Sequence, residues 1–395
     1  MRLNHLHVSD YRNLCTIDLD FPRDVTLVIG PNAQGKSNLL EAIYLLATMR
    51  STRVETDAQL IRRDALEDVL PAARIVGEVS TANGPLKIEV TLVARPGANG
   101  PIATKTVKLN GVAKRLSDAT GRLTAVLFTA EDLEMISGSP SLRRRYLDLT
   151  LAQIDPHYAQ ARSHFERVLT QRNSLLKRIR EGVAGTAELE FWDEQLATDG
   201  AVLFHARALA VGRLAVLARE AHAELAPGEA LAIEYLPKLD SMGNLAETDE
   251  ASVRDAYLKA LAASVNRDTG AGMTTLGPHR DDLTFTLDGL QAAGFASRAQ
   301  QRTIALSLRL AETQLLRERR GESPVLLLDD ILSEMDASRR ESVMGALGHV
   351  EQMLVTGTDW DRFPEEFAAG ASLFEIEAGS VRPLVPGLPG ARTSD

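Results

Sequence analysis

The chain has 395 residues, which is enough for two or three domains of ordinary size with a sizeable core. Hydrophobic residues make up 44% and charged residues 25%, a balance that excludes a disordered tail protein or a fibrous repeat. The formal net charge is −10, so nucleic-acid binding would need a local basic patch. Cys15 is the only cysteine, which excludes an intramolecular disulfide and a cysteine-rich zinc cluster. We expect neither a signal peptide nor a membrane-spanning run, which favours a soluble cytoplasmic protein without a membrane partner.

The first third of the chain shows the pattern of a sheet protein. Short apolar runs between residues 3 and 29 predict three strands, and the Leu- and Ala-rich segment 38–49 predicts a helix after the third. Further strands are expected at 73–79, 86–93 and 104–116. In the last of these segments, Asn110-Gly111 predicts a type I′ hairpin. This region is therefore expected to form an antiparallel sheet.

The middle of the chain changes to helical periodicity. Residues 141–225 predict a lobe of two short antiparallel helices, with a turn near Gly182 and Gly185. Strands are expected again at 231–235 and 283–287, followed by a helix at 300–320 and strands at 325–328 and 353–356. The tail after residue 383 is rich in Pro and Gly, which is typical of disorder.

One glycine-bearing turn carries a phosphate-binding pattern. Residues 30–37 match G-x4-G-K-[ST] and lie between a predicted strand and a predicted helix, the context that this motif requires. Backbone N–H groups and the helix N-terminus would bind ATP phosphates, with Lys36 on the β- and γ-phosphates and Ser37 on Mg²⁺. The expected nucleotide-binding residues are Gly30, Pro31, Asn32, Ala33, Gln34, Gly35, Lys36 and Ser37.

An acidic pair supplies the second half of such a site. The apolar run 325–328 ends in Asp329, expected as a Mg²⁺ ligand, and Asp330, expected as the general base that works with Lys36. Asp329 follows Lys36 by 293 positions. The two ends of the chain are therefore expected to form one nucleotide-binding head, with the helical segment inserted between them.

A third element precedes the acidic strand. Ser297-Arg-Ala-Gln300-Gln-Arg-Thr opens the helix expected before Asp329, and it resembles the signature motif of ABC-type ATPases. Together with the phosphate loop, Gly277-Pro-His-Arg-Asp-Asp282 and the run 326–336, it resembles the bacterial RecF family in family order from residue 3 to about 358. Ala299 is a departure, because the family usually has glycine there and a methyl group hinders close approach to phosphate.

The resemblance implies an α/β fold with an ABC-type P-loop ATPase head assembled from N- and C-terminal segments, an antiparallel β subdomain and an inserted helical lobe. The expected boundaries are 1–139 for the N-terminal part of the head, 140–226 for the lobe, 227–382 for the C-terminal part with signature and acidic strand, and 383–395 for the tail.

The resemblance also implies a function. ATP would be sandwiched between two heads, with Ser297 and Gln300 of one copy on the nucleotide of the other, residues 333–336 at the dimer interface and 356–358 at a switch position. The implied protein is an ATP-dependent homodimeric clamp on gapped DNA or single-strand/double-strand junctions. It would hydrolyse ATP slowly for release and assist RecA loading with RecR and RecO.

A basic stretch in the helical lobe is the predicted DNA-binding surface. Residues 140–180 contain nine Lys or Arg against three acids, a local charge of +6 that suits phosphate-backbone binding. The candidates are Arg143, Arg144, Arg145, Arg172, Lys177 and Arg178. Phe191 and Trp192 are interpreted as core residues, and His279 to Asp282 as a structural or interdomain element.

Other classes of protein remain as alternatives. The main one is a kinase-like P-loop enzyme that acts on a small substrate, with the middle segment as a lid; the signature element argues against it. An SMC-type structural protein with long coiled-coil arms would need sustained heptads, which the lobe is too short to hold. A transporter subunit would keep its nucleotide motifs closer together than the 293 positions that separate Lys36 from Asp329.

Overall fold

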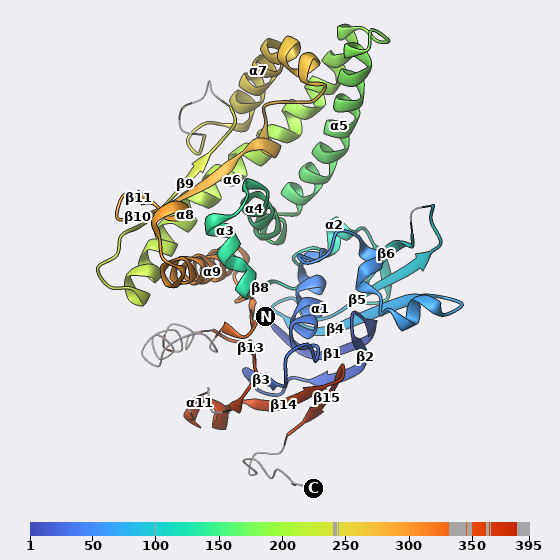
Figure 1. Cartoon of the computed structure of the whole chain (residues 1–395), viewed down its shortest axis with the longest axis vertical. Helices are drawn as coiled ribbons and strands as arrows, with labels where there is room; N and C mark the ends of the chain where they lie inside the picture. The colour runs from blue at the N-terminus through green and yellow to red at the C-terminus, as the bar shows by residue number, and fades with distance from the viewer. Residues whose placement is uncertain are drawn as a thin grey trace. The chain divides into compact units, whose positions relative to one another are not determined.

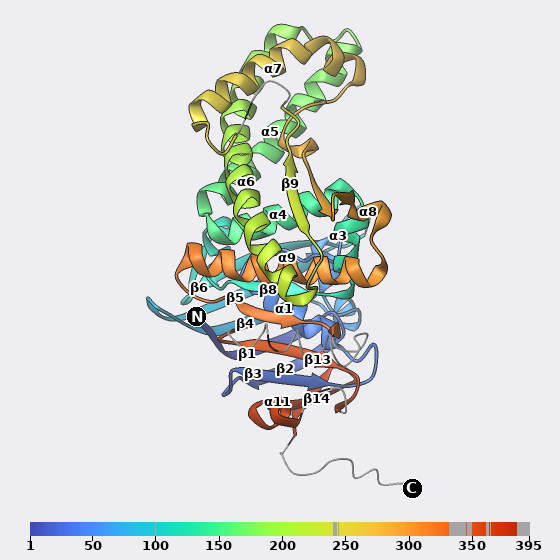
Figure 2. The ribbon, with the colours of Figure 1, turned by 90° about the vertical axis from the view of Figure 1, so that its left-hand side faces the viewer.

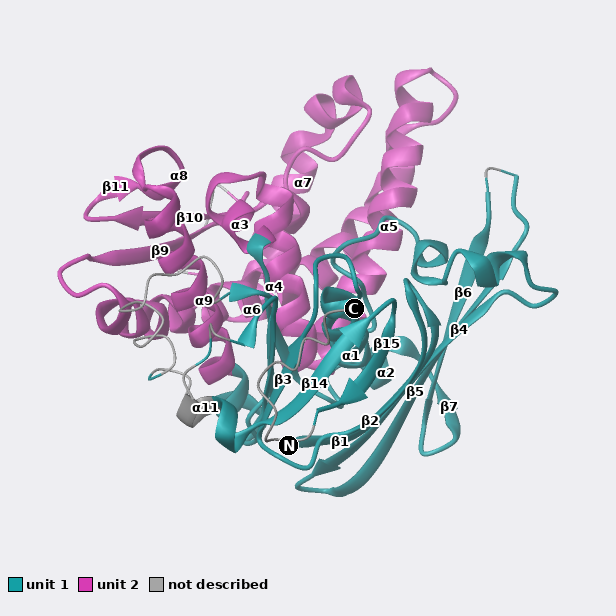
Figure 3. Ribbon diagram, turned by 60° about the horizontal axis from the view of Figure 1, so that its bottom comes forward, with its two compact units in different colours: residues 1–130, 316–395 teal, residues 131–315 magenta. Residues whose placement is uncertain are grey.

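The protein is described here by a computed structural model that covers residues 1–98, 100–239, 243, 245–331, 345, 350–360, 363 and 365–384. It divides into two compact units (Figure 3). Unit 1 consists of residues 1–130 and 316–395, and unit 2 of the continuous segment 131–315. The expectation that both ends of the chain build one head is thereby confirmed.

Unit 1 contains a six-stranded antiparallel sheet in the order β2-β1-β4-β5-β6-β7. The Asn110-Gly111 turn has φ angles of 48° and 81°, the two positive values that a type I′ hairpin needs, so this prediction is confirmed. The sheet forms the expected antiparallel subdomain. Its strands are β1 (Arg2–Tyr11), β2 (Leu14–Asp20), β4 (Ala72–Thr81), β5 (Gly84–Arg95), β6 (Ile102–Leu109) and β7 (Val112–Lys114).

The second sheet of unit 1 combines strands from both ends of the chain, in the order β15-β14-β3-β13-β12-β8. β14, β3, β13, β12 and β8 are parallel, and β15 is an antiparallel edge strand. Strands β8, β14 and β15 were not predicted. The strands are β3 (Val25–Ile29), β8 (Ala125–Phe128), β12 (Val325–Leu328), β13 (Met353–Gly357), β14 (Ser372–Glu377) and β15 (Ser380–Pro383).

Helix α1 (Lys36–Thr48) contacts strands of both sheets and buries nearly all of its residues, which explains why its sequence is apolar on every side. Parallel strands β12 and β8 carry four buried residues each, as expected for strands covered on both faces. Short elements complete unit 1: η1 (Asp57–Leu60), η2 (Asp64–Glu67), α2 (Leu116–Ala119) and α11 (Glu365–Gly370).

Unit 2 is built mainly of helices, of which α5, α6 and α7 pack side by side (Figures 1 and 2). A small sheet of order β11-β10-β9 packs on α6 through β9. The elements are η3 (Ala130–Asp132), α3 (Leu133–Ser137), α4 (Pro140–Ile154), α5 (Pro156–Arg180), η4 (Thr186–Glu188), α6 (Leu189–Leu225), β9 (Leu231–Leu236), α7 (Glu250–Ala271), η5 (Pro278–Arg280), β10 (Asp282–Leu287), β11 (Leu290–Gln291), α8 (Ala292–Phe295) and α9 (Arg298–Arg320), whose last turn lies in unit 1.

The unit boundaries differ from the expected domain boundaries. Residues 227–315 lie with the helices and not with the nucleotide head, because β9 and β10 pair with each other and bury Leu231, Ile233, Leu283 and Phe285 in the core of unit 2. The inserted segment is thus larger than a two-helix hairpin, and it includes α7, which was not predicted.

Helix α6, taken with η4, is long and apolar enough to cross a membrane by length and composition, with a mean hydropathy of 1.6 over its most apolar window. No such run was expected from the sequence. Half of that window is buried inside the protein, and Arg207 in the same helix forms buried ion pairs with Asp148 and Asp281. Packing in the core of unit 2 therefore accounts for the composition of α6.

Candidate functional site

The phosphate-binding pattern lies in the loop between β3 and α1, as predicted. Gly35 has φ +118°, and a Cβ atom there would lie 2.7 Å from Leu14 Cδ2. A Cβ on Gly30 would lie 2.3 Å from the carbonyl oxygen of Ile376. Both glycines are therefore required by close packing, while Pro31, Asn32 and Ala33 at the top of the loop are exposed.

The start of α1 is arranged for an anion. The residue before the helix is Gly35, and within the described chain no side chain caps the helix start. The first turn also contains no acidic residue. The N–H groups of the loop and of the first helical turn can therefore donate to a phosphate, and the helix dipole favours its negative charge.

Lys36 lies against the loop that it follows. Its Nζ donates to the carbonyl oxygens of Gly30 at 2.5 Å and Pro31 at 3.0 Å. Burial lowers the pKa of Lys36, and the charges of Asp330, Asp329 and Asp359 act in the opposite direction. A cationic donor and three carboxylates thus share one electrostatic environment.

The acidic pair follows β12, as predicted. Thr356 on the neighbouring strand β13 donates from Oγ1 to Asp329 Oδ1 at 2.9 Å and accepts from the N–H of Asp330 at 3.0 Å. β13 also pairs with β3, so the phosphate loop and the acidic pair leave the same edge of the sheet. Sequence reasoning noted Thr356 only as part of a switch position and missed Asp359, which no motif marks.

The donor set suits Mg²⁺. Ser37 offers a hydroxyl and Asp329 a carboxylate, and both are the hard oxygen ligands that this ion prefers. Among the described residues, no group of three His, Cys, Asp or Glu could hold a metal by itself. An ion held by Ser37 and Asp329 would therefore take its other ligands from nucleotide phosphates and water.

Gln34 has a structural role that the motif did not reveal. Its Oε1 accepts from the N–H of Ala378 at 2.6 Å, and its carbonyl oxygen accepts from the N–H of Gly379 at 3.1 Å. Asn13 Nδ2 donates to the carbonyl oxygen of Ala33 at 3.2 Å. The turn between β14 and β15, 344 positions further along the chain, therefore holds the phosphate loop in place.

The signature residues begin α9 in unit 2. Ser297 Oγ accepts from the N–H of Gln300 at 3.2 Å, and Gln300 Oε1 accepts from the N–H of Ser297 at 2.9 Å, which is a capping box. Gln300 Nε2 also donates to Glu229 Oε1 at 3.0 Å. Ser297 and Ala299 are exposed, and Phe295 beside them is 73% exposed.

The basic candidates divide into buried and exposed residues. Arg172 is fully buried and pairs with Asp193 at 2.6 Å and Asp268 at 2.7 Å, and Arg143 is 8% exposed and pairs with Asp282 at 2.6 Å. The expectation that these two arginines contact DNA is therefore wrong, because each is buried and forms its ion pairs with carboxylates inside unit 2.

The other four basic candidates remain at the surface to different degrees. Arg144 is half-buried and donates to the carbonyl oxygen of Asp281 at 2.7 Å. Arg145 is also half-buried, whereas Lys177 and Arg178 near the end of α5 are exposed. Among the six candidates, Lys177 and Arg178 are thus the basic residues most open to a ligand.

The two aromatic residues at the start of α6 differ in burial. Trp192 packs against the core of unit 2, as predicted. Phe191 is 61% exposed and stands edge-on to Trp192 with 5.0 Å between ring centroids, so its interpretation as a core residue is wrong.

The His279 to Asp282 segment is built into unit 2. His279 Nε2 lies 3.1 Å from the carbonyl oxygen of Thr274, and burial lowers its pKa to about 4. Asp281 accepts from Arg207 and from the hydroxyl of Tyr235, and burial raises its pKa to about 6. These contacts favour the structural interpretation.

The expected dimer loop 333–336 and most of the tail, residues 385–395, lie outside the described residues.

Fold and site together define a P-loop ATPase head of the ABC type, with phosphate loop and acidic strand brought together from opposite ends of the chain. The family model described as RecF/RecN/SMC N terminal domain matches residues 2–367. The chain belongs to the RecF family.

Two relatives and one solved structure document this membership, and a second solved structure shares the fold. The DNA replication and repair protein RecF of Chloroflexus aurantiacus is 42% identical over 392 residues, covering 96% of this chain and 99% of the relative. RecF of Roseiflexus castenholzii is 40% identical over 395 residues, covering 97% and 100%. A structure of the recombination mediator protein RecF with ATP, in the RecFOR pathway, has a TM-score of 0.85, 34% identity and 97% coverage of both chains. An Smc head bound to the C-terminal winged-helix domain of ScpA has a TM-score of 0.51 at 13% identity over 97% of both chains, which is a likeness of fold alone.

Proposed function

We propose that this chain is an ATP-binding protein of DNA replication and recombinational repair that works in the RecFOR pathway. The observation that carries the proposal is the phosphate loop, with Lys36 placed at its carbonyl groups and under the influence of Asp329, Asp330 and Asp359. The names of the relatives and the ATP complex of a structure at 34% identity support the same function.

The proposed mechanism is an ATP-gated clamp. Residues 30–37 bind the ATP phosphates, Ser37 and Asp329 hold Mg²⁺, and Asp330 polarises the attacking water. The capping box of exposed Ser297 and half-buried Gln300 contacts the nucleotide of a second copy, so that ATP joins two heads. In the cytoplasm, the closed dimer holds gapped DNA or a single-strand/double-strand junction, assists RecA loading with RecR and RecO, and opens after slow hydrolysis.

Sedimentation velocity with ATP and Mg²⁺ tests the dimer. We expect the wild type to dimerise, Lys36→Arg to lose both nucleotide binding and dimerisation, and Ser297→Arg to keep nucleotide binding while remaining a monomer. Ser174→Arg is the matched control, since Ser174 is exposed on α5, a different helix from α9; this variant should dimerise normally.

Repeating the experiment with gapped DNA tests the clamp. We expect salt-sensitive DNA binding that requires ATP and follows dimerisation. A protein that stays monomeric in every condition and still hydrolyses ATP would refute the sandwich mechanism and favour the kinase-like enzyme.

A further inference from the structure

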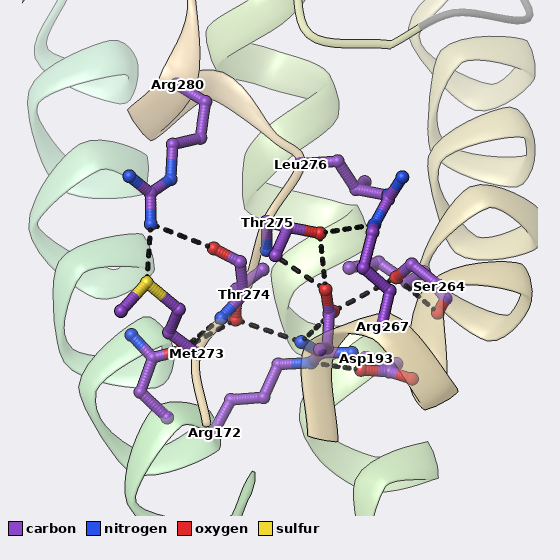
Figure 4. Close-up of polar contacts among 12 residues, drawn as sticks. Arg172, Asp193, Ser264, Arg267, Met273, Thr274, Thr275, Leu276 and Arg280 are labelled. Carbon is purple, nitrogen blue, oxygen red and sulfur yellow. Dashed lines mark hydrogen bonds and ion pairs between the residues drawn. The ribbon is translucent and has the colours of Figure 1, made fainter. Parts of the chain in front are cut away.

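Three arginines from three separate elements of unit 2 converge on one short segment, residues 271–275. They are Arg180 at the end of α5, Arg267 in α7 and Arg280 in η5. Figure 4 shows Arg267 and Arg280 on this segment. The contacts are Arg180 Nη1 to Ala271 O at 3.4 Å, Arg267 Nε to Thr275 Oγ1 at 2.8 Å, Arg280 Nη2 to Thr274 O at 3.3 Å and Arg280 Nη2 to Met273 Sδ at 3.1 Å. We call Arg180, Arg267 and Arg280 the arginine cluster.

The cluster is open to solvent and its charge is not neutralised by ion pairs. All three side chains are exposed, and within the described chain no carboxylate forms an ion pair with any of them. A guanidinium carries five N–H donors, and the contacts above use only a few of the fifteen. Exposed Lys177 lies one turn before Arg180 on α5 and adds a fourth positive charge to the same surface.

Two acidic side chains beneath the segment, Asp193 and Asp268, pair with a buried arginine. Arg172 donates to Asp193, to Asp268 and, at 2.9 Å, to Thr274 Oγ1. Asp268 also accepts from the N–H of Thr275 at 3.0 Å and from its hydroxyl at 2.6 Å. This buried network occupies Asp193 and Asp268 and fixes the segment that the arginine cluster surrounds.

We propose that the arginine cluster is a binding site for the backbone phosphates of DNA. The proposal rests on the DNA binding proposed above and assigns it a surface in unit 2. Arginine forks match phosphate oxygens in geometry and charge, and a segment already fixed by buried hydrogen bonds loses little freedom on binding.

The composition of the surface favours DNA over a protein partner. Protein interfaces centre on aromatic and other apolar side chains. Of the four contacts given above, three are made to oxygen atoms and one to the thioether of Met273. Phosphate contacts need donors and no apolar surface. The overall charge of −10 makes such a local surface necessary for any DNA binding.

The test measures the affinity of the full chain, with ATP and Mg²⁺, for a fluorescein-labelled gapped duplex over about 50 to 200 mM salt. The variants are Arg180→Gln, Arg267→Gln and Arg280→Gln, singly and combined. Arg254→Gln is the matched control, because Arg254 is exposed on the same helix as Arg267 but pairs with Asp255 at 2.9 Å. Nucleotide affinity and the unfolding temperature are measured for each variant.

We expect each single variant to lower the slope of log affinity against log salt by about one, and the triple variant by about three with at least a tenfold loss of affinity. Arg254→Gln should match the wild type, and nucleotide affinity should be unchanged in all variants. If the triple variant is poorly folded, the single variants decide.

Two results would overturn the inference. If the wild type binds DNA and the triple variant binds it with the same affinity and salt slope, the arginine cluster is not the site; an acidic protein as its partner would give this result. If the wild type does not bind gapped DNA at all, the proposed function itself is wrong, and the assignment of this surface to DNA is refuted with it.

Discussion

Replacing Arg172 by methionine should destabilise unit 2, because this arginine is the centre of a buried ion network. Its side chain has no exposed surface, and it pairs with Asp193 and Asp268 at 2.6 and 2.7 Å. Methionine has a similar length but leaves both carboxylates buried without their cation. Breaking a buried pair by removing one partner costs about 3 to 5 kcal/mol.

The expected loss can be converted to a melting temperature. Unit 2 spans residues 131–315, a size for which 1 kcal/mol shifts the midpoint by about 2 to 4 °C. Arg172→Met should therefore lower the midpoint of unit 2 by about 6 to 20 °C. Trp192 packs against the core of unit 2, and the other tryptophan is Trp360 in unit 1, so a Trp360→Phe background makes Trp192 fluorescence report on unit 2.

Two further variants make this prediction specific. Adding Asp193→Asn and Asp268→Asn to Arg172→Met removes the uncompensated charges and should restore more than half of the lost stability. Arg167→Met, at an exposed position of the same helix, should change stability by about 0.5 kcal/mol or less. A midpoint within 2 °C of the wild type for Arg172→Met, with a selective loss of DNA affinity, would show that our interpretation of Arg172 as an internal residue is wrong.

Three other predictions concern the nucleotide site and acid stability. Gly35→Ala should lower ATP affinity at least about tenfold in a fluorescent-nucleotide titration without changing the circular dichroism, because its φ of +118° and the 2.7 Å approach to Leu14 admit no Cβ; unchanged affinity would contradict it. Thr356→Val should lower the kcat of ATP hydrolysis about tenfold with little change in KM, since the hydroxyl connects Asp329 and Asp330, and Thr356→Ser should restore it. Burial holds the pKa of His279 at about 4, against 6.5 in the unfolded chain. Between these two pH values the imidazole is protonated in the unfolded state and neutral in the folded state. Stability should therefore fall by about 2 kcal/mol between pH 7 and pH 5, and His279→Gln should remove this part of the pH dependence of the Trp192 melting curve.

Local signals explain what the sequence could predict of the fold. The three N-terminal strands, α1 and the Asn110-Gly111 hairpin depend on neighbouring residues, and all are confirmed. Helix α7 was missed because its buried face has apolar residues only as far as Leu261 and continues with Ser264 and Asp268, which read as polar in a sequence. The helix packs against α6 and α5, which are distant along the chain and do not enter a local sequence pattern.

The same limit applies to the site. The phosphate loop is contiguous and carries a motif, so its position between β3 and α1 could be predicted in full. The sequence pattern indicated a basic surface at Arg143 and Arg172 because their carboxylate partners are distant along the chain. Asp282 lies 139 positions from Arg143, and Asp193 and Asp268 lie 21 and 96 positions from Arg172. The role of Gln34 depends on Ala378 at the other end of the chain, which no spacing rule connects to it.

The attachment of the phosphate loop to the β14–β15 turn has a consequence during synthesis. At about 5 to 20 residues per second, the ribosome needs about 20 to 70 s to add the 344 positions that separate Gln34 from Ala378. For most of that time β3 lacks both of its partner strands, β13 and β14, and the continuous segment of unit 2 is complete before either strand is made. The nascent chain can therefore complete unit 2 first and acquires its ability to bind nucleotide last, so chains that stop before the final hairpin should be unable to hold ATP.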